Sequence, residues 1–198
     1  ELCGGSTTML DNYAARAAAA VVADSFALRG DLLARGVAEA RISVVHPAIE
    51  QPRPASAPWP AYLPGRGEPL IACAAPLEER GGVHLLLTAM TPLLRVHPTL
   101  RLVLAGSGAG QTELMNHAAP LGGAVIFTGH PEREELAAIY EAADIVIFPG
   151  LPTGSLAVAR KPLEAMAHGA LVLASDTVPH RELVDHGSNG VLFEAGSV

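Results

Sequence analysis

A regular alternation of short apolar runs and helical segments fills the chain from residue 70 onward, and it most constrains the fold. The apolar runs span 70–74, 100–106, 124–129, 144–150, 170–175 and 190–195, and the helical segments lie around 83–95, 110–119, 133–142, 162–168 and 180–186. The runs lack polar alternation, which is typical of parallel strands covered by helices on both faces. The pattern therefore predicts an α/β fold with a doubly wound parallel sheet over residues 70–198.

A proline-rich stretch, residues 51–69, separates this region from the first fifty residues and predicts a linker, because proline neither continues a helix nor donates to a sheet. Residues 1–50 favour an Ala-rich helix, a second helix capped by Asp24 or Ser25 and ended by Gly36, and a strand at 41–45. So short a segment cannot enclose a core of its own, so we expect it to pack on another domain. The 198-residue chain begins with Glu1, and we expect it to be a piece of a longer protein.

The charge and the cysteines exclude several classes of function. Thirteen basic and twenty acidic side chains give a net charge of -7, which opposes binding to nucleic acid or to an anionic membrane surface. Cys3 and Cys73 are far apart and form no metal-ligand spacing, so neither a disulfide framework nor a zinc site is predicted. Because no run has the length of a membrane span or the order of a signal peptide, we expect a cytoplasmic location.

The strand-to-helix turns are the candidate ligand sites, because ligands of doubly wound sheets bind beyond the carboxyl ends of the strands. The first turn carries Arg80, Gly81 and Gly82, which either approach an anion with backbone N–H groups or simply allow a tight turn; both interpretations stay open. A later helix, opened by Pro162, has Arg160 and Lys161 at its N-terminus, where cations oppose the helix dipole. An anionic ligand would remove that conflict.

Two further turns carry weaker signals. The turn at 105–111 has the spacing G-x-G-x-G, with Gln111 where the dinucleotide fingerprint needs its last glycine, and the next strand ends in Thr128 and Gly129 rather than in an acidic residue. A nicotinamide cofactor is therefore disfavoured. His130 follows Gly129 at a strand end, and as a lone histidine it is interpreted more readily as a surface residue than as a ligand or base.

Residues 161–196, KPLEAMAHGALVLASDTVPHRELVDHGSNGVLFEAG, and the preceding FTGHPEREELAAIYEAADIVIFP resemble the C-terminal half of a group 1 glycosyltransferase, a retaining family with the GT-B fold. The resemblance is closest to the subgroup associated with exopolysaccharide and exosortase loci. Residues 1–50 resemble the end of the family's N-terminal domain. The resemblance implies a Rossmann-like domain that forms one half of a GT-B fold, with residues 1–50 as the remnant of a missing acceptor domain.

The resemblance also implies roles for individual residues. Glu164 matches the second Glu of the family's E-x7-E motif and would bind the two ribose hydroxyls of a nucleotide-sugar; a solvent-facing helix Glu is the alternative. Lys161 and the backbone of Arg160 fall where the family holds the donor diphosphate, and main-chain groups of Gly129 and His130 where it holds the base. No metal or other cofactor is implied, because cationic side chains and helix N-termini neutralise the departing diphosphate.

Gly81 and Gly82 match the family's phosphate-facing turn, but the chain departs from the pattern in two places. Leu156 stands where the first Glu of the motif belongs, and the adjacent Ser155 is not acidic either. The family's Arg and Lys of the first turn are replaced by Ala74 or Ala75 and by Gly81, unless Arg80 stands in for one of them.

The sequence therefore predicts transfer of a sugar, with anomeric retention, from a nucleoside-diphosphate donor to a glycan or lipid-linked saccharide acceptor. Turnover would require the missing N-terminal domain, through which the full-length protein could also associate peripherally with a membrane. A degenerate nucleotide- or glycan-binding module is the main alternative, and a sugar-nucleotide epimerase with the same two-domain fold is a third.

Overall fold

The computed structural model describes residues 9–50, 60–65, 67–152, 156 and 159–197, and within them a three-layer α/β/α domain follows a small N-terminal unit. The N-terminal unit contains α1 (Met9–Ala17), β1 (Val21–Ala23), α2 (Phe26–Ala34) and β2 (Ile42–Val44). The larger domain contains β3 (Leu70–Ala74), α3 (Val83–Val96), β4 (Arg101–Ala105), α4 (Gln111–Ala118), β5 (Val125–Gly129), α5 (Arg133–Ala142), β6 (Ile145–Phe148), α6 (Arg160–Ala167), β7 (Leu171–Ser175), α7 (Val178–Arg181) and β8 (Val191–Phe193).

The sheet of the larger domain has the strand order β5-β4-β3-β6-β7-β8 among the described residues, and every neighbouring pair is parallel. From β3 the chain winds outward through β4 to β5, and it then returns to place β6 on the other side of β3. The winding direction therefore reverses between β3 and β6, which is the topological switch point of the sheet. The predicted doubly wound parallel sheet is confirmed.

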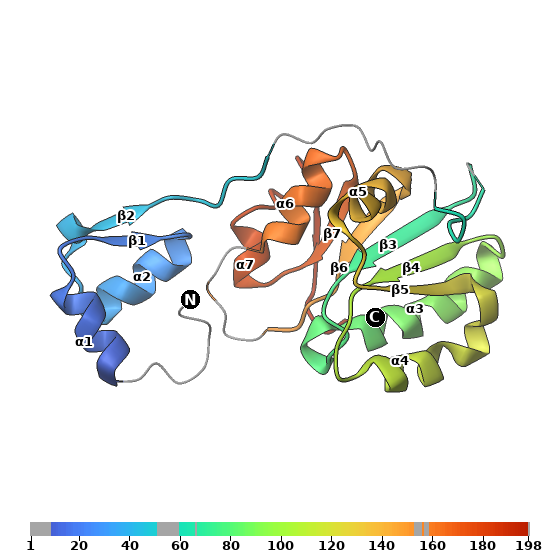
Figure 1. The fold of residues 1–198 in the computed structure, drawn as a ribbon, viewed down its shortest axis with the longest axis horizontal. Coiled ribbons are helices and arrows are strands. Elements are labelled where there is room, and N and C mark those ends of the chain that lie inside the picture. Colours follow the sequence, from blue (N-terminus) through green and yellow to red (C-terminus); the bar gives the residue numbers. More distant parts are fainter. Residues whose placement is uncertain (1–8, 51–59, 66, 153–155, 157–158, 198) are drawn as a thin grey trace.

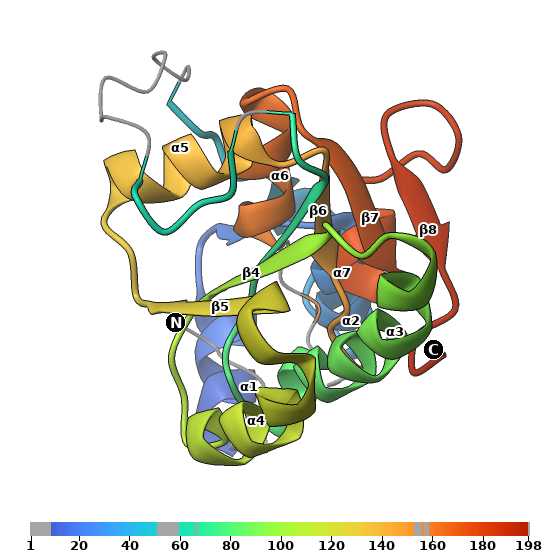
Figure 2. The same ribbon diagram turned by 90° about the vertical axis from the view of Figure 1, so that its right-hand side faces the viewer.

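Helices cover both faces of this sheet, as Figure 2 shows with α5 and α6 on one side and α3 and α4 on the other. Side chains of each strand alternate between two cores, because successive residues of a strand point to opposite faces. Ala72 and Ala74 of β3 pack with α5 and α6, whereas Cys73 of the same strand packs with α3 and α4. Both faces of the strands are thus apolar, which explains why the sequence shows apolar runs without alternation.

The N-terminal unit has a small apolar cluster of its own, in which Ala23, Leu32 and Val37 are buried. Ser25 caps α2, since its hydroxyl accepts a hydrogen bond from the backbone N–H of Leu28 at 3.0 Å, and Gly36 ends the helix region with a φ of +84°. These two predictions are confirmed. In the described residues, no apolar cluster draws from both this unit and the six-stranded sheet.

Three local predictions were wrong. No strand was predicted between the first two helices, but the Ala-rich helix ends at Ala17 and Val21–Ala23 form β1. This strand pairs in parallel with Ile42–Val44. The helix expected to open at Pro162 begins at Arg160, which costs no hydrogen bond because the first N–H groups of a helix lack intrahelical partners. The helix expected at 180–186 is the four-residue α7 at Val178–Arg181. Beyond it, the N–H of Asp185 donates to the side-chain oxygen of Asn189, and the side-chain NH₂ of Asn189 donates to the carbonyl of Leu183. These two backbone groups therefore do not continue the helix.

Candidate functional site

The candidate site lies at the carboxyl ends of β3 and β6, where the winding direction reverses. The turn after β3 contains Arg80, Gly81 and Gly82, and the turn after β6 contains Pro149 and Gly150. The two turns contact each other directly, because the backbone N–H of Leu151 donates to the carbonyl of Arg80 at 2.9 Å. In doubly wound sheets this edge is where ligands bind.

Gly82 is required for the close approach of the two turns. Its φ is +68°, and a Cβ built there would lie 1.9 Å from the carbonyl oxygen of Pro149. Gly81 is buried, and a Cβ there would lie 2.1 Å from the carbonyl oxygen of Pro76. Of the two interpretations that the sequence left open, the structure supports a packing role for both glycines, because their N–H groups donate to the carbonyls of Glu78 and Glu79, each at 3.0 Å. That the two glycines take part in donor binding stays a prediction.

The glycines of the 105–111 turn have the same explanation. A Cβ on Gly106 would lie 2.0 Å from the carbonyl oxygen of Ala75, and one on Gly108 would lie 2.5 Å from that of Leu77. The backbone of this turn is bonded to the first turn, with Leu77 N–H donating to Ser107 O at 3.1 Å and Gly110 N–H donating to Leu77 O at 2.8 Å. Contact between the two turns thus explains why this turn needs its glycines.

Arg80 has an acidic partner in its own turn. Its guanidinium forms a 2.8 Å ion pair with Glu78, and the Arg80 side chain is 63% exposed. An exposed pair of this kind contributes little to stability, so a stronger anionic partner would compete effectively for Arg80.

Helix α6 brings the remaining cationic and acidic candidates to the same edge. Arg160 is exposed at its first position, Lys161 is half-buried, and Glu164 is half-buried one turn further on. Burial raises the pKa of the Cys73 thiol to about 12, and the positive charge of Lys161 partly opposes that rise. Because Cys73 is the penultimate residue of β3, Lys161 lies within electrostatic reach of the end of that strand.

Gly129 and His130 lie further along the sheet edge. β5 is two strands away from β3, which corresponds to about 10 Å at ordinary strand spacing. Gly129 has a φ of +72°, its carbonyl accepts from Gly106 N–H at 2.6 Å, and His130 is exposed. The sheet edge therefore offers one group of residues around β3 and α6 and a second group at β5, two strands from β3.

Leu156, the departure from the E-x7-E pattern, lies where the N-terminal unit meets the α6 loop. Its carbonyl accepts a 2.6 Å hydrogen bond from the Ser25 hydroxyl, which at the same time caps α2. Ser155, like Cys3 and most of the proline-rich linker, lies outside the described residues.

Ser175 and His180 support the site although the sequence did not single them out. The Ser175 hydroxyl donates to the carbonyl of Gly150 at 2.6 Å, so it holds the turn after β6. His180 is buried, and its Nδ1 lies 2.7 Å from the carbonyl of Ser175; because a carbonyl only accepts, Nδ1 carries the proton. Burial lowers the pKa of His180, against a raising effect of that backbone hydrogen bond.

The described residues contain neither a metal-binding cluster nor a membrane-spanning helix. No group of three or more His, Cys, Asp or Glu side chains in that part of the chain is arranged to hold a metal ion. None of its helices has the length and apolar character needed to cross a membrane. The prediction that no metal takes part stays a prediction.

A parallel, doubly wound sheet with its polar and cationic residues gathered at the switch point defines a Rossmann-like ligand-binding domain. Residues 68–198 match the family model described as glycosyl transferases group 1, and the chain belongs to that family. Glycogen synthase of Mycobacterium tuberculosis is 32% identical over 167 residues, which cover 81% of this chain and 37% of the relative. Phosphatidyl-myo-inositol mannosyltransferase of Mycolicibacterium smegmatis is 30% identical over 138 residues, 70% of this chain and 35% of the relative.

The fold is also that of solved GT-B glycosyltransferases. HepE of Anabaena, solved in complex with UDP-glucose, superposes with a TM-score of 0.76 at 24% identity, over 94% of this chain and 52% of that protein. The chain thus spans little more than a third of the curated relatives and about half of this structural neighbour.

Proposed function

We propose that residues 70–198 form the donor domain of a glycosyltransferase that binds a nucleoside-diphosphate sugar along the carboxyl edge of its sheet. The observation that carries the proposal is the direct contact of the turn after β3 with the turn after β6 at the switch point, within electrostatic reach of Lys161 on α6. Lys161 brings a positive charge there, although the chain as a whole is negative. This local positive charge suits a small anionic ligand.

The names of related proteins support the same class of donor. HepE of Anabaena was solved with UDP-glucose, and one relative from Corynebacterium glutamicum is named as a GDP-mannose-dependent mannosyltransferase. These names describe those proteins, and they do not choose between uridine and guanosine for this chain. UDP and GDP are therefore both appropriate probes.

In the proposed arrangement, the diphosphate lies between the β3 turn and the first turn of α6. Lys161 and the α6 dipole stabilise the negative charge that grows on the departing diphosphate. The Glu164 carboxylate accepts hydrogen bonds from the two ribose hydroxyls, and the base extends toward the main chain of Gly129 and His130. We nominate no general base, since in a retaining transfer the leaving phosphate can take the acceptor proton.

The proposal extends to the complete enzyme. It comprises transfer with retention to a glycan or lipid-linked saccharide, residues 1–50 as part of an acceptor domain, and a cytoplasmic protein with peripheral membrane contact through the missing half. It also includes membership of the exopolysaccharide-associated subgroup. The sequence of residues 161–196 supports this membership.

Calorimetric titration of the chain with UDP, GDP, UDP-glucose and GDP-mannose tests the donor site. We expect saturable binding of at least one nucleotide and its loss in Glu164→Ala. Lys161→Ala should weaken UDP far more than uridine, because the nucleoside lacks the diphosphate; a charge-assisted contact corresponds to about tenfold or more in affinity. Arg101→Ala, at the opposite end of the sheet, is the matched loss of a cation. The donor site is refuted if no nucleotide gives heat, and equal losses for UDP and uridine would show that Lys161 does not face the phosphates.

Leu156 favours a second candidate, a module that binds nucleotide without handling the sugar. In the family pattern this position carries the carboxylate that contacts the transferred sugar. A donor site used for transfer should bind the sugar nucleotide more tightly than the nucleotide alone. A non-catalytic module should bind UDP and UDP-glucose with equal affinity, so the ratio of the two constants separates the candidates.

A further inference from the structure

The hydroxyl of Tyr140 is buried without a hydrogen-bond partner. Tyr140 lies on α5 and is 2% exposed. Its Oη is one of two buried side-chain nitrogen or oxygen atoms that have no hydrogen-bond partner in the described part of the chain. A buried hydroxyl without a partner destabilises a protein, and phenylalanine would fill the same space without that cost. An unpaired group of this kind calls for an explanation in function or in a missing partner.

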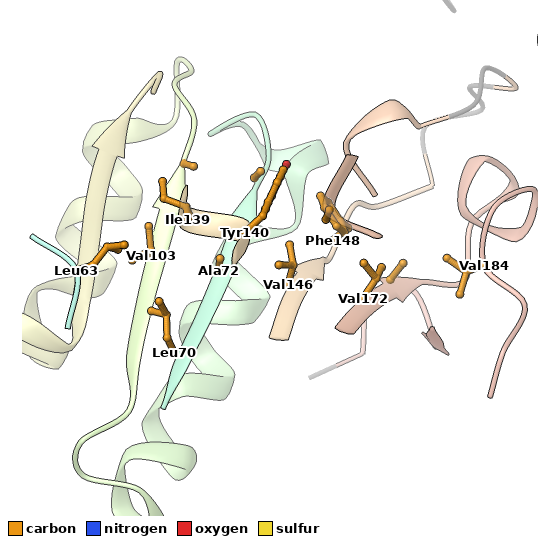
Figure 3. Packing of buried hydrophobic residues seen from close by; sticks show 14 residues of the cluster. Leu63, Leu70, Ala72, Val103, Ile139, Tyr140, Val146, Phe148, Val172 and Val184 are labelled. Carbon is orange, nitrogen blue, oxygen red and sulfur yellow. The ribbon is translucent and has the colours of Figure 1, made fainter. Parts of the chain in front are cut away.

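The hydroxyl lies toward the switch point rather than deep in the core. In Figure 3 the Tyr140 ring passes Ala72 and points away from Leu70, so its oxygen is directed toward the carboxyl end of β3. The same apolar cluster contains Ala74 and Phe148, the last residues of β3 and β6. The ring thus reaches from α5 to the edge at which the candidate site is built.

Glu164 is the acidic neighbour of this hydroxyl. Ala165, the next residue of α6, packs in the cluster that contains Tyr140, and the ring of His168, one turn after Glu164, has its centroid 6.2 Å from that of Tyr140. Burial raises the pKa of Tyr140, and the negative charge of Glu164 raises it further. No hydrogen bond between the two groups is present, and none joins the Glu164 carboxylate to another described side chain.

We propose that Tyr140 is a positioning residue of the donor site: its hydroxyl donates to one oxygen of the Glu164 carboxylate and leaves the other to accept from a ribose diol. The bond forms when the ribose draws the carboxylate into its bound orientation, so the energy of the unpaired hydroxyl is recovered on binding. This inference rests on the proposed function, in which Glu164 holds the ribose. It adds a residue that the E-x7-E pattern does not contain.

The test compares Tyr140→Phe with Tyr62→Phe in the full chain. Tyr62 lies on the surface and donates to Glu135, so its variant removes a tyrosine hydroxyl and a hydrogen bond without altering Tyr140 or Glu164. Each protein is titrated with UDP and GDP, and then with the 2′,3′-dideoxy form of the tighter-binding nucleotide, which lacks the diol. Thermal unfolding without nucleotide is measured in parallel.

We expect Tyr140→Phe to lose about tenfold in affinity for the ribonucleotide and nothing for the dideoxy nucleotide. It should combine non-additively with Glu164→Gln, because both variants remove the same contact. Its melting temperature should equal or exceed that of the wild type, whereas Tyr62→Phe should bind like the wild type.

Three results would overturn the inference while leaving the donor site in place: unchanged ribonucleotide affinity, equal losses for both nucleotides, or a clear fall in melting temperature, which would reveal a structural partner for the hydroxyl. If the wild type binds neither UDP nor GDP, the proposed function fails and this inference with it.

Discussion

Replacement of Gly82 by alanine tests whether backbone contact between two turns builds the switch point. Two costs combine at this position. A left-handed backbone costs an L residue about 1–2 kcal/mol, and forcing apart packed groups costs a further 1–3 kcal/mol or so, because the new Cβ would meet the carbonyl oxygen of Pro149 at 1.9 Å. We therefore expect Gly82→Ala to lower the free energy of unfolding by about 2–5 kcal/mol.

Two other glycines separate these costs. Gly169 has a φ of +79° with nothing within 4 Å of a built Cβ, so Gly169→Ala reports the left-handed cost alone. Gly81 has no left-handed φ but would place its Cβ 2.1 Å from Pro76 O, so Gly81→Ala reports the clash alone. Urea unfolding followed by circular dichroism measures all three variants against the wild type. If Gly82→Ala is no more destabilising than Gly169→Ala, the contact between the turns is not tight and the argument is refuted.

The remaining predictions concern Glu182 and His180. The Glu182 carboxylate accepts from Phe26 N–H at 2.6 Å and lies 3.0 Å from His46 Nε2; burial tends to raise its pKa, but these hydrogen bonds lower it overall. Glu182→Ala should destabilise the N-terminal unit by about 1–2 kcal/mol, seen as faster hydrogen exchange in α2, while the exposed Glu194→Ala leaves exchange unchanged. Because the folded pKa of Glu182 lies below its ordinary value, this contribution is present near neutral pH and is lost as pH falls through the folded pKa. Burial lowers the pKa of His180, so at low pH the unfolded chain binds a proton at this residue more readily than the folded chain does. Stability should therefore fall as pH drops below about 6.5. His180→Gln should flatten that segment of the pH profile, and an unchanged slope would contradict the assignment.

The apolar runs predicted the six-stranded sheet because a strand buried on both faces has a local signature. β1 escaped prediction since Val21 and Val22 follow an Ala-rich helix, and what makes them a strand is their pairing with Ile42 and Ser43, some twenty residues away. α7 was predicted too long because the Asn189 amide, which lies beyond the expected helix end, competes for its backbone groups. In both cases the deciding contact is not local.

The candidate site shows the same division. Lys161 and Glu164 could be proposed from the sequence because a conflict with the helix dipole and a motif are readable within a few residues. Tyr140 was not found, because its significance lies in the missing partner of one oxygen, and Ser175 matters through a carbonyl 25 residues away. Arg80 lies in the turn after β3, as the sequence predicted, but its ion pair with Glu78 depends on side-chain geometry that the sequence does not encode locally, and its role in binding stays a prediction.

The attachment of the N-terminal unit has a mechanical consequence. Ser25 and Phe26, adjacent residues at the start of α2, contact Leu156 and Glu182 of the larger domain, and the two parts share no apolar cluster in the described residues. His46 and Glu50, which follow β2, also contact Glu182 at 3.0 Å and Arg133 at 2.6 Å, so polar contacts on both sides of the unit hold it, and their loss exposes little buried apolar surface. Because Ser25 donates to Leu156, four residues before α6 begins at Arg160, a change in the position of the N-terminal unit would act on the chain just before α6.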